Sequence, residues 1–201
     1  MTIVAYQGEP GAFSEAAIVA LFGVAATPLP CPWFGDVVAA VESGRAELAL
    51  LPVENSIAGP VAESIAAIER SSLVVTGTTA LPIRLSLLAL PGATLESLRS
   101  VASHPVALRQ CGGFLGAHPW LAPRESHDTA GAAREVAESN DNGRGAIASA
   151  RAGELNGLVV LAEGIEDRSD NVTQFAIVAR EAAPGRLSAL DDRGTPANLE
   201  R

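Results

Sequence analysis

The chain has 201 residues and a formal net charge of −9 at pH 7, from 14 basic and 23 acidic residues. All of its basic residues are arginine, which excludes a lysine Schiff base and the lysine of a phosphate-binding loop. The acidic balance argues against nucleic acid as a partner. A small anionic ligand would therefore have to be held by arginines, hydroxyl groups or backbone N–H groups at helix starts.

The remaining composition indicates a globular protein, with 48% hydrophobic residues and only 4% aromatic residues. Cys31 and Cys111 lie far apart, and the three histidines lack zinc-ligand spacing, so we expect no metal site. The N-terminus has no secretory signal, and apolar runs such as Leu87–Leu90 are too short to cross a membrane. The sequence therefore predicts a cytoplasmic protein with reduced thiols.

The first part of the chain alternates short apolar strands with short helices. The turn residues Gly8-Glu9-Pro10-Gly11 separate the first strand from the first helix. Gly23 and Gly44 are expected to end two helices, and Asp36 is expected to cap one. The expected strands are 3–6, 47–51 and 73–76, and the expected helices are 13–22, 36–43 and 61–70.

The second part repeats this alternation. Helices are expected after Pro105 and after Asp128, and the strand pattern resumes at 81–90. Further strands are expected at 101–103, 145–148, 158–161 and 174–178, and the apolar pattern stops in a loose tail over 181–201. The alternation predicts an α/β protein with mostly parallel sheets, in which ligands bind after the carboxyl ends of strands.

Several sequence blocks occur in an order typical of one enzyme family. Residues 8–15 read Gly-Glu-Pro-Gly-Ala-Phe-Ser-Glu, residues 51–59 read Leu-Pro-Val-Glu-Asn-Ser-Ile-Ala-Gly, and Ser103-His104-Pro105 is followed by Gln110-Cys111. Weaker blocks follow at 128–133, 146–149 and 165–175. Together, over roughly residues 2 to 180, these blocks resemble prephenate dehydratase.

This resemblance implies a fold of two α/β lobes, like a type 2 periplasmic binding protein, with the substrate in an interlobe cleft. The first lobe would contain residues 1–80 and 167–180, and the second lobe 81–166. Most family members continue into an ACT-type domain that senses phenylalanine. The residues after Arg180 are too few for one, so we expect no ACT domain and no such feedback. The family also implies a homo-oligomer, a dimer or a tetramer.

The resemblance further implies the conversion of prephenate, a small dianion, to phenylpyruvate with loss of carbon dioxide and water. Aromatisation drives the reaction, so no cofactor is expected, and the protein mainly orients the substrate and donates hydrogen bonds. Thr173 matches the essential threonine of the family's Thr-Arg-Phe motif, and its hydroxyl would donate a hydrogen bond to the departing hydroxyl group. Asn55 and Gln110 match the other catalytic positions. The expected substrate-binding residues are Glu54, Ser56, Ser103, Thr129, Ser149, Gln174 and Phe175.

One position departs from the family, because Thr-Arg-Phe reads Thr173-Gln174-Phe175 here. A charge-assisted contact to a carboxylate is worth about 1.5–3 kcal/mol, or about 10- to 150-fold in affinity. Either substrate binding has weakened or changed, or another arginine takes the place of the family's motif arginine. The candidates are Arg84, Arg109 and Arg168.

Each of these residues also has a purely structural interpretation. Asn55 and Ser56 are good helix caps, His104 fits a hydrogen-bonded turn, and the cysteines fit buried packing positions. Phe175 is as easily a core residue as a ligand contact, and Glu54 is an acid or base or an arginine's partner. Three other functions stay open on the same scaffold: a prephenate decarboxylase, an arogenate dehydratase and a non-catalytic small-anion-binding protein.

Overall fold

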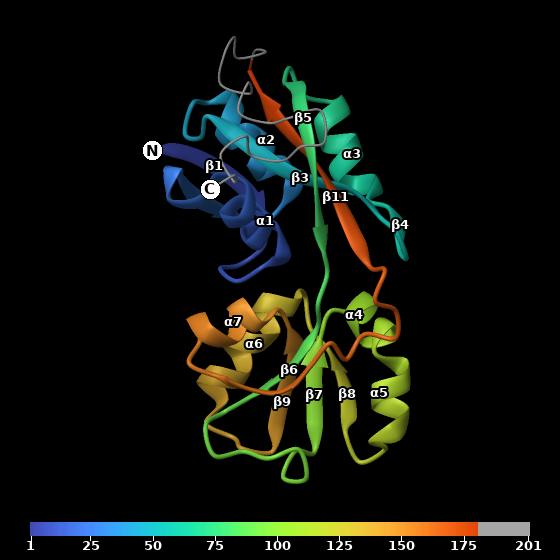
Figure 1. Cartoon of the computed structure of the whole chain (residues 1–201). Helices are drawn as coiled ribbons and strands as arrows, with labels where there is room; N and C mark the ends of the chain where they lie inside the picture. Colours follow the sequence, from blue (N-terminus) through green and yellow to red (C-terminus); the bar gives the residue numbers. More distant parts are fainter. Residues whose placement is uncertain (181–201) are drawn as a thin grey trace, which may run out of the picture. The chain divides into compact units, whose positions relative to one another are not determined.

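The computed structural model describes residues 1–180 and is α/β, as expected (Figure 1). The loose tail expected at 181–201 lies outside the described residues. The described chain forms two compact units. Unit 1 contains Met1–Gln7, Ser14–Leu81 and residues 172–180, and unit 2 contains Gly8–Phe13 and Pro82–Asn171.

Unit 1 is built on one sheet with the strand order β2-β1-β3-β11-β5, and β4 also pairs with β3. Its strands are β1 (Thr2–Gln7), β2 (Ala26–Cys31), β3 (Leu48–Asn55), β4 (Gly59–Pro60), β5 (Val74–Pro82) and β11 (Val172–Ala179). Its helices are α1 (Phe13–Phe22), α2 (Phe34–Glu42) and α3 (Ala62–Glu69), with a 3-10 turn at Gly23–Ala25. Strand β1 is parallel to both β2 and β3, whereas β4 and β11 are antiparallel to β3.

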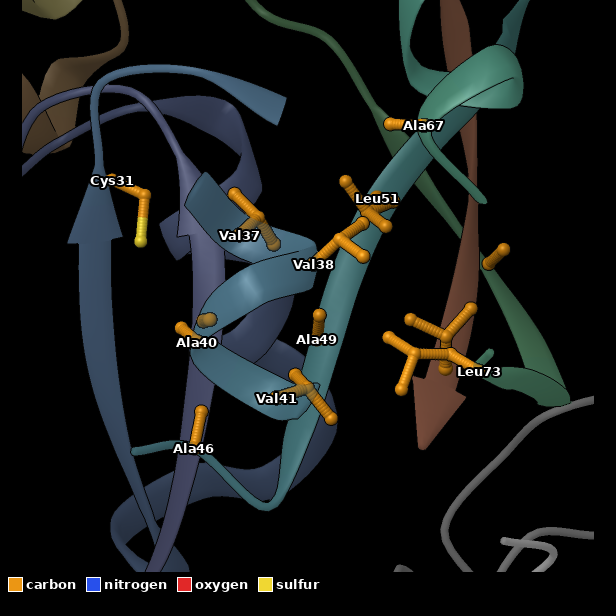
Figure 2. Packing of buried hydrophobic residues seen from close by; sticks show 13 residues of the cluster. Cys31, Val37, Val38, Ala40, Val41, Ala46, Ala49, Leu51, Ala67 and Leu73 are labelled. Atoms are coloured by element: carbon orange, nitrogen blue, oxygen red, sulfur yellow. The ribbon is translucent and has the colours of Figure 1, made fainter. Parts of the chain in front are cut away.

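The core of unit 1 forms where α2 packs on this sheet. Val38 and Val41 of α2 lie close to Leu51 and Ala49 of β3, and Val37 belongs to the same buried cluster (Figure 2). The helix begins two residues before the expected cap Asp36. Its N-cap is Trp33, which makes no side-chain capping bond, so burial of the apolar face fixes this helix more than capping does.

Unit 2 is built on a second sheet with the order β10-β6-β9-β7-β8. Its strands are β6 (Ser86–Ala89), β7 (Ser100–Ser103), β8 (Ala122–Glu125), β9 (Arg144–Ala148) and β10 (Val159–Glu163). Its helices are α4 (Pro105–Gln110), α5 (Gly112–Ala117), α6 (Thr129–Ser139) and α7 (Ala150–Leu155). Ala132, Ala133 and Val136 of α6 are fully buried, and the partly buried Ala137 packs against the same core cluster.

Both sheets are mixed rather than mostly parallel, and the reason lies in where the chain enters them. Strand β7 is parallel to β8 and β9, but β6 is antiparallel to β9 and β10. Ser86 at the start of β6 pairs with Ala148 at the end of β9, and Thr173 near the start of β11 pairs with Asn55 at the end of β3. Strands that enter at the carboxyl edge of their neighbours must run antiparallel to them.

Candidate functional site

The carboxyl end of β3 carries a hydrogen-bonded pair of predicted catalytic residues. Asn55 lies directly opposite Thr173 of β11. The Asn55 Nδ2 donates to Thr173 Oγ1 over 2.9 Å and to the Val172 carbonyl over 3.3 Å. Unit 1 therefore brings together two residues that are 118 positions apart in the sequence.

The turn that follows β3 holds this pair in place. Asn55 Oδ1 accepts from the backbone N–H groups of Ile57 over 3.0 Å and Ala58 over 2.8 Å. Asn55 therefore caps a tight turn rather than a helix. Ser56 bonds twice to Val172, since its N–H donates to the Val172 carbonyl over 2.9 Å and its Oγ accepts from the Val172 N–H over 3.0 Å.

The other three predicted site residues of unit 1 are Glu54, Gln174 and Phe175, and they differ in their exposure to solvent. Glu54 and Gln174 are exposed and lie opposite each other across β3 and β11. Within residues 1–180, Glu54 makes no ion pair. Phe175 is only 1% exposed and packs inside unit 1, as a core residue does.

In unit 2, Gln110 ends helix α4 and is held at two points. Asn171 Nδ2 donates to Gln110 Oε1 over 3.1 Å, and the Asp167 N–H donates to the Gln110 carbonyl over 2.7 Å. Asp167 Oδ1 in turn accepts from the Gly113 N–H over 2.8 Å. Asn171, which is fully buried, was not among the predicted site residues although it belongs to the same sequence block as Thr173.

Ser103 and His104 follow strand β7. The buried Ser103 hydroxyl donates to the Ile147 carbonyl over 2.5 Å, so its proton is already used in a hydrogen bond inside unit 2. His104 Nδ1 accepts from the Val106 N–H over 3.2 Å and caps α4, which confirms its structural interpretation. Burial lowers the pKa of His104, and the nearby Arg109 lowers it further, so this ring is neutral at pH 7.

The N-terminal glycine loop belongs to unit 2, although the sequence placed it in the first lobe. Arg134 donates two hydrogen bonds to the Glu9 carboxylate, from Nε to Oε2 over 2.6 Å and from Nη2 to Oε1 over 3.0 Å. Hydrogen bonding to Arg134 lowers the pKa of Glu9. The Ser149 hydroxyl donates to the Gly11 carbonyl over 2.7 Å and accepts from the Ala152 N–H at the start of α7. The predicted binding residue Ser149 thus ties the glycine loop to a helix start.

Thr129, the last of the predicted binding residues, begins helix α6. The helix is capped by Asp128, whose Oδ1 accepts from the Gly131 N–H over 2.6 Å. Thr129 is partly buried, and its hydroxyl has no partner among residues 1–180.

The three candidate arginines have different surroundings. Arg84 pairs with Glu166 over 2.9 Å, and Arg168 pairs with Asp170 over 2.6 Å. Arg109 is exposed and makes no ion pair with any described residue. An arginine without an acidic partner keeps its full charge for a ligand.

The nucleophile and metal chemistry available to the described residues is limited. Cys111 is fully buried, and burial raises its pKa to about 12, so its thiol stays protonated. Over residues 1–180, no group of three His, Cys, Asp or Glu side chains is placed to hold a metal ion. No helix in that range has the length and apolar character needed to cross a bilayer.

Two sequence relatives of this chain have a dehydratase activity in their names. Arogenate dehydratase 1 of Petunia hybrida is 46% identical over 185 residues, which cover 92% of this chain and 43% of that protein. A bifunctional N-acyl-homoserine lactone acylase/prephenate dehydratase of Komagataeibacter europaeus is 41% identical over 195 residues, or 94% of this chain and 68% of that protein. The chain thus spans less than half the length of the plant relative.

Solved structures agree with the sequence relatives. A prephenate dehydratase from Arthrobacter aurescens, in complex with L-Phe, matches with a TM-score of 0.83 and 32% identity over 90% of this chain and 61% of that one. A Bacillus subtilis lipoprotein, described as methionine-binding, matches at 12% identity with a TM-score of 0.51 over 96% of this chain and 89% of that one, and so supports the two-lobed binding-protein fold alone. The prephenate dehydratase family model matches residues 4–183, and the chain belongs to this family.

Proposed function

We propose that the chain is a dehydratase that converts prephenate to phenylpyruvate. The observation that carries this proposal is the Thr173 hydroxyl, which accepts a hydrogen bond from Asn55 over 2.9 Å. Within residues 1–180 no group accepts the proton of this hydroxyl. It therefore remains available to a substrate, while the remainder of the Thr173 residue is held in strand β11.

The reaction balances without a cofactor. The ring carboxylate leaves as carbon dioxide, its bonding electron pair enters the ring, and the ring expels its hydroxyl group. The oxygen departs as hydroxide and becomes water by taking a proton from the solvent. A threonine hydroxyl is too weak an acid to give up its proton at neutral pH, so Thr173 stabilises the developing negative charge by hydrogen-bond donation.

Arg109 is our candidate for binding a substrate carboxylate. It adjoins Gln110, a predicted catalytic residue, and it alone of the three candidate arginines has no acidic partner among the described residues. The roles of Gln110, Thr129 and Glu54 rest on the family resemblance and stay predictions. Ser103 and Ser149 donate their hydroxyl protons to backbone carbonyls, so we propose that they hold the backbone of unit 2 rather than donate to the substrate.

The test is product analysis with purified protein. We expect phenylpyruvate from prephenate above the acid-catalysed background, and a loss of turnover on the order of 100-fold or more in Thr173→Ala. Thr173→Ser should keep most of the activity. Thr76→Ala is the matched control, because Thr76 Oγ1 donates to the Ile177 carbonyl of the same sheet and should matter only for stability. Full turnover by Thr173→Ala would refute the assignment.

Arogenate is the second candidate substrate. The Petunia relative, at 46% identity, is named as an arogenate dehydratase. Arogenate carries an amino group where prephenate carries a keto group, so the same elimination would give phenylalanine directly. Parallel assays with both substrates decide between them by comparing kcat/KM.

The two remaining alternative functions predict different results in the assay with prephenate. A prephenate decarboxylase would release a non-aromatic product that retains the hydroxyl group. A small-anion-binding protein would bind prephenate without turnover. We also propose a cytoplasmic homo-oligomer, which light scattering of the purified chain and fractionation of its native cells would test.

A further inference from the structure

The orientation of the Asn55 amide is fixed by groups that can act in only one way. The backbone N–H groups of Ile57 and Ala58 can only donate, so the atom that faces them must be Oδ1. The Val172 carbonyl can only accept, so the atom that faces it must be Nδ2. The contacts at both ends of the amide therefore require the same orientation, in which the NH2 group faces Thr173 and donates to it.

This orientation determines the direction of the Thr173 hydroxyl. A threonine hydroxyl has one proton and two acceptor lone pairs. Because Asn55 donates to Thr173 Oγ1, the Thr173 proton cannot point at Asn55 and must point elsewhere. We propose that Asn55 is a positioning residue, which acts through Thr173 by keeping its hydroxyl in the donating direction.

This inference deepens the proposed function and rests on it. It also assigns Asn55 a role different from direct substrate contact. The simplest competing interpretation is that Asn55 only caps the turn after β3, through its bonds to Ile57 and Ala58. The two interpretations predict opposite effects for one conservative substitution.

Asn55→Asp keeps the shape of the side chain and keeps one oxygen for the turn. The ionised carboxylate can only accept, so it would capture the Thr173 proton and turn the hydroxyl away from the substrate. We expect kcat to fall on the order of 100-fold or more, with KM within roughly 3-fold of the wild-type value. Asn55→Ala removes the turn bonds but leaves the Thr173 hydroxyl able to rotate and donate.

The ranking of these two variants separates the interpretations. If Asn55 positions Thr173, Asn55→Asp is the slower enzyme although it is the better structural replacement. If Asn55 only caps the turn, Asn55→Asp is the faster enzyme, because aspartate caps about as well as asparagine and alanine does not. Thermal unfolding of both variants shows whether they are folded. If Asn55→Asp does not fold, Asn55→Ala is compared in the wild-type and Thr173→Ala backgrounds. A residue that acts only through Thr173 causes no further loss of kcat once Thr173 is alanine, and an equal loss in both backgrounds would overturn the proposal.

A pH profile gives a second readout. When the introduced carboxyl group is protonated it can donate to Thr173 again, so kcat of Asn55→Asp should recover relative to wild type as the pH falls from 7 toward 4. Other ionisable groups lie on β3 itself and on the elements packed against it. They are Tyr6 on β1, Asp36 and Glu42 on α2, Glu54 on β3, and Glu63 and Glu69 on α3. Adding Glu63→Gln to Asn55→Asp controls for an exposed acidic group on a helix packed against β3 and should leave the recovery unchanged.

The wild-type protein separates failure of this inference from failure of the proposed function. If wild type converts neither prephenate nor arogenate, the proposed function fails, and the positioning role fails with it. If wild type is active but Asn55→Asp outperforms Asn55→Ala, or shows no recovery at low pH, only the positioning role is overturned.

Discussion

Thr173 and Gln174 are consecutive residues of β11, and their side chains point to opposite faces of the sheet. Thr173 is 9% exposed and bonds to Asn55, whereas Gln174 is exposed and lies opposite Glu54. Successive strand residues alternate between faces, so we predict that a ligand that accepts the Thr173 proton does not contact the Gln174 side chain directly. On this prediction, the departure from the family motif falls on the face away from the proposed chemistry.

Gln174→Arg should accordingly leave catalysis almost unchanged. We expect kcat and KM for prephenate to stay within roughly 3-fold of wild type, because the new cation lies opposite Glu54 rather than beside the Thr173 hydroxyl. A cross-strand pair with Glu54 would add about 0.2–1 kcal/mol of stability. Steady-state kinetics and urea unfolding of Gln174→Arg and Gln174→Ala measure both effects. A fall in KM of tenfold or more in Gln174→Arg would show that the motif arginine binds substrate after all.

Arg109→Gln should instead weaken substrate binding. Losing a charge-assisted contact to a carboxylate costs about 1.5–3 kcal/mol, so we expect KM for prephenate to rise about 10- to 150-fold with little change in kcat. The control is Arg124→Gln, because Arg124 on β8 is also exposed and has no ion pair within residues 1–180. Equal effects of the two substitutions would mean that general charge, rather than a specific contact, governs binding.

The fold class and several elements could be predicted from the sequence because they depend on local patterns. The expected helix at 13–22 is α1, and the helix expected after Asp128 is α6. Strand β2 was missed because Pro28 and Pro30 weaken the strand pattern. A proline is tolerated there, since β2 is an edge strand.

The hydrogen bonds around the candidate residues of each unit could not be predicted, because they join distant parts of the chain. Thr173 and Asn55 are 118 positions apart, and Arg134 and Glu9 are 125 positions apart. No periodicity or spacing rule encodes such pairs. For the same reason, the sequence could not show that the Ser103 and Ser149 protons are taken by backbone carbonyls.

Gly11→Ala should destabilise unit 2. Gly11 has φ +92°, and a Cβ atom there would lie 2.6 Å from the Ala152 Cα, a backbone atom that cannot easily move. Gly157→Ala is the control, because Gly157 also has a positive φ (+66°) but nothing within 4 Å of the added Cβ. We expect about 1–2 kcal/mol of loss from strain in Gly157→Ala and a clearly larger loss in Gly11→Ala. Equal losses in urea unfolding would show that the loop moves away from Ala152 at no cost.

Glu9 should make stability depend on pH through its contact with Arg134. The hydrogen bond from Arg134 lowers the pKa of Glu9 in the folded protein below its value in the unfolded chain. The contact therefore contributes its full stabilisation above the unfolded pKa of about 4.3. This stabilisation is lost as the pH falls through the lower pKa of the folded state. Both side chains are partly exposed, which limits the contribution to below about 1 kcal/mol. The stability difference between wild type and Glu9→Gln should therefore be constant from pH 6 to 8 and shrink below about pH 5. Urea unfolding across this range measures it, with Glu138→Gln as the control because Glu138 is the more exposed partner of Arg134. A difference that grows toward acid pH would contradict this assignment.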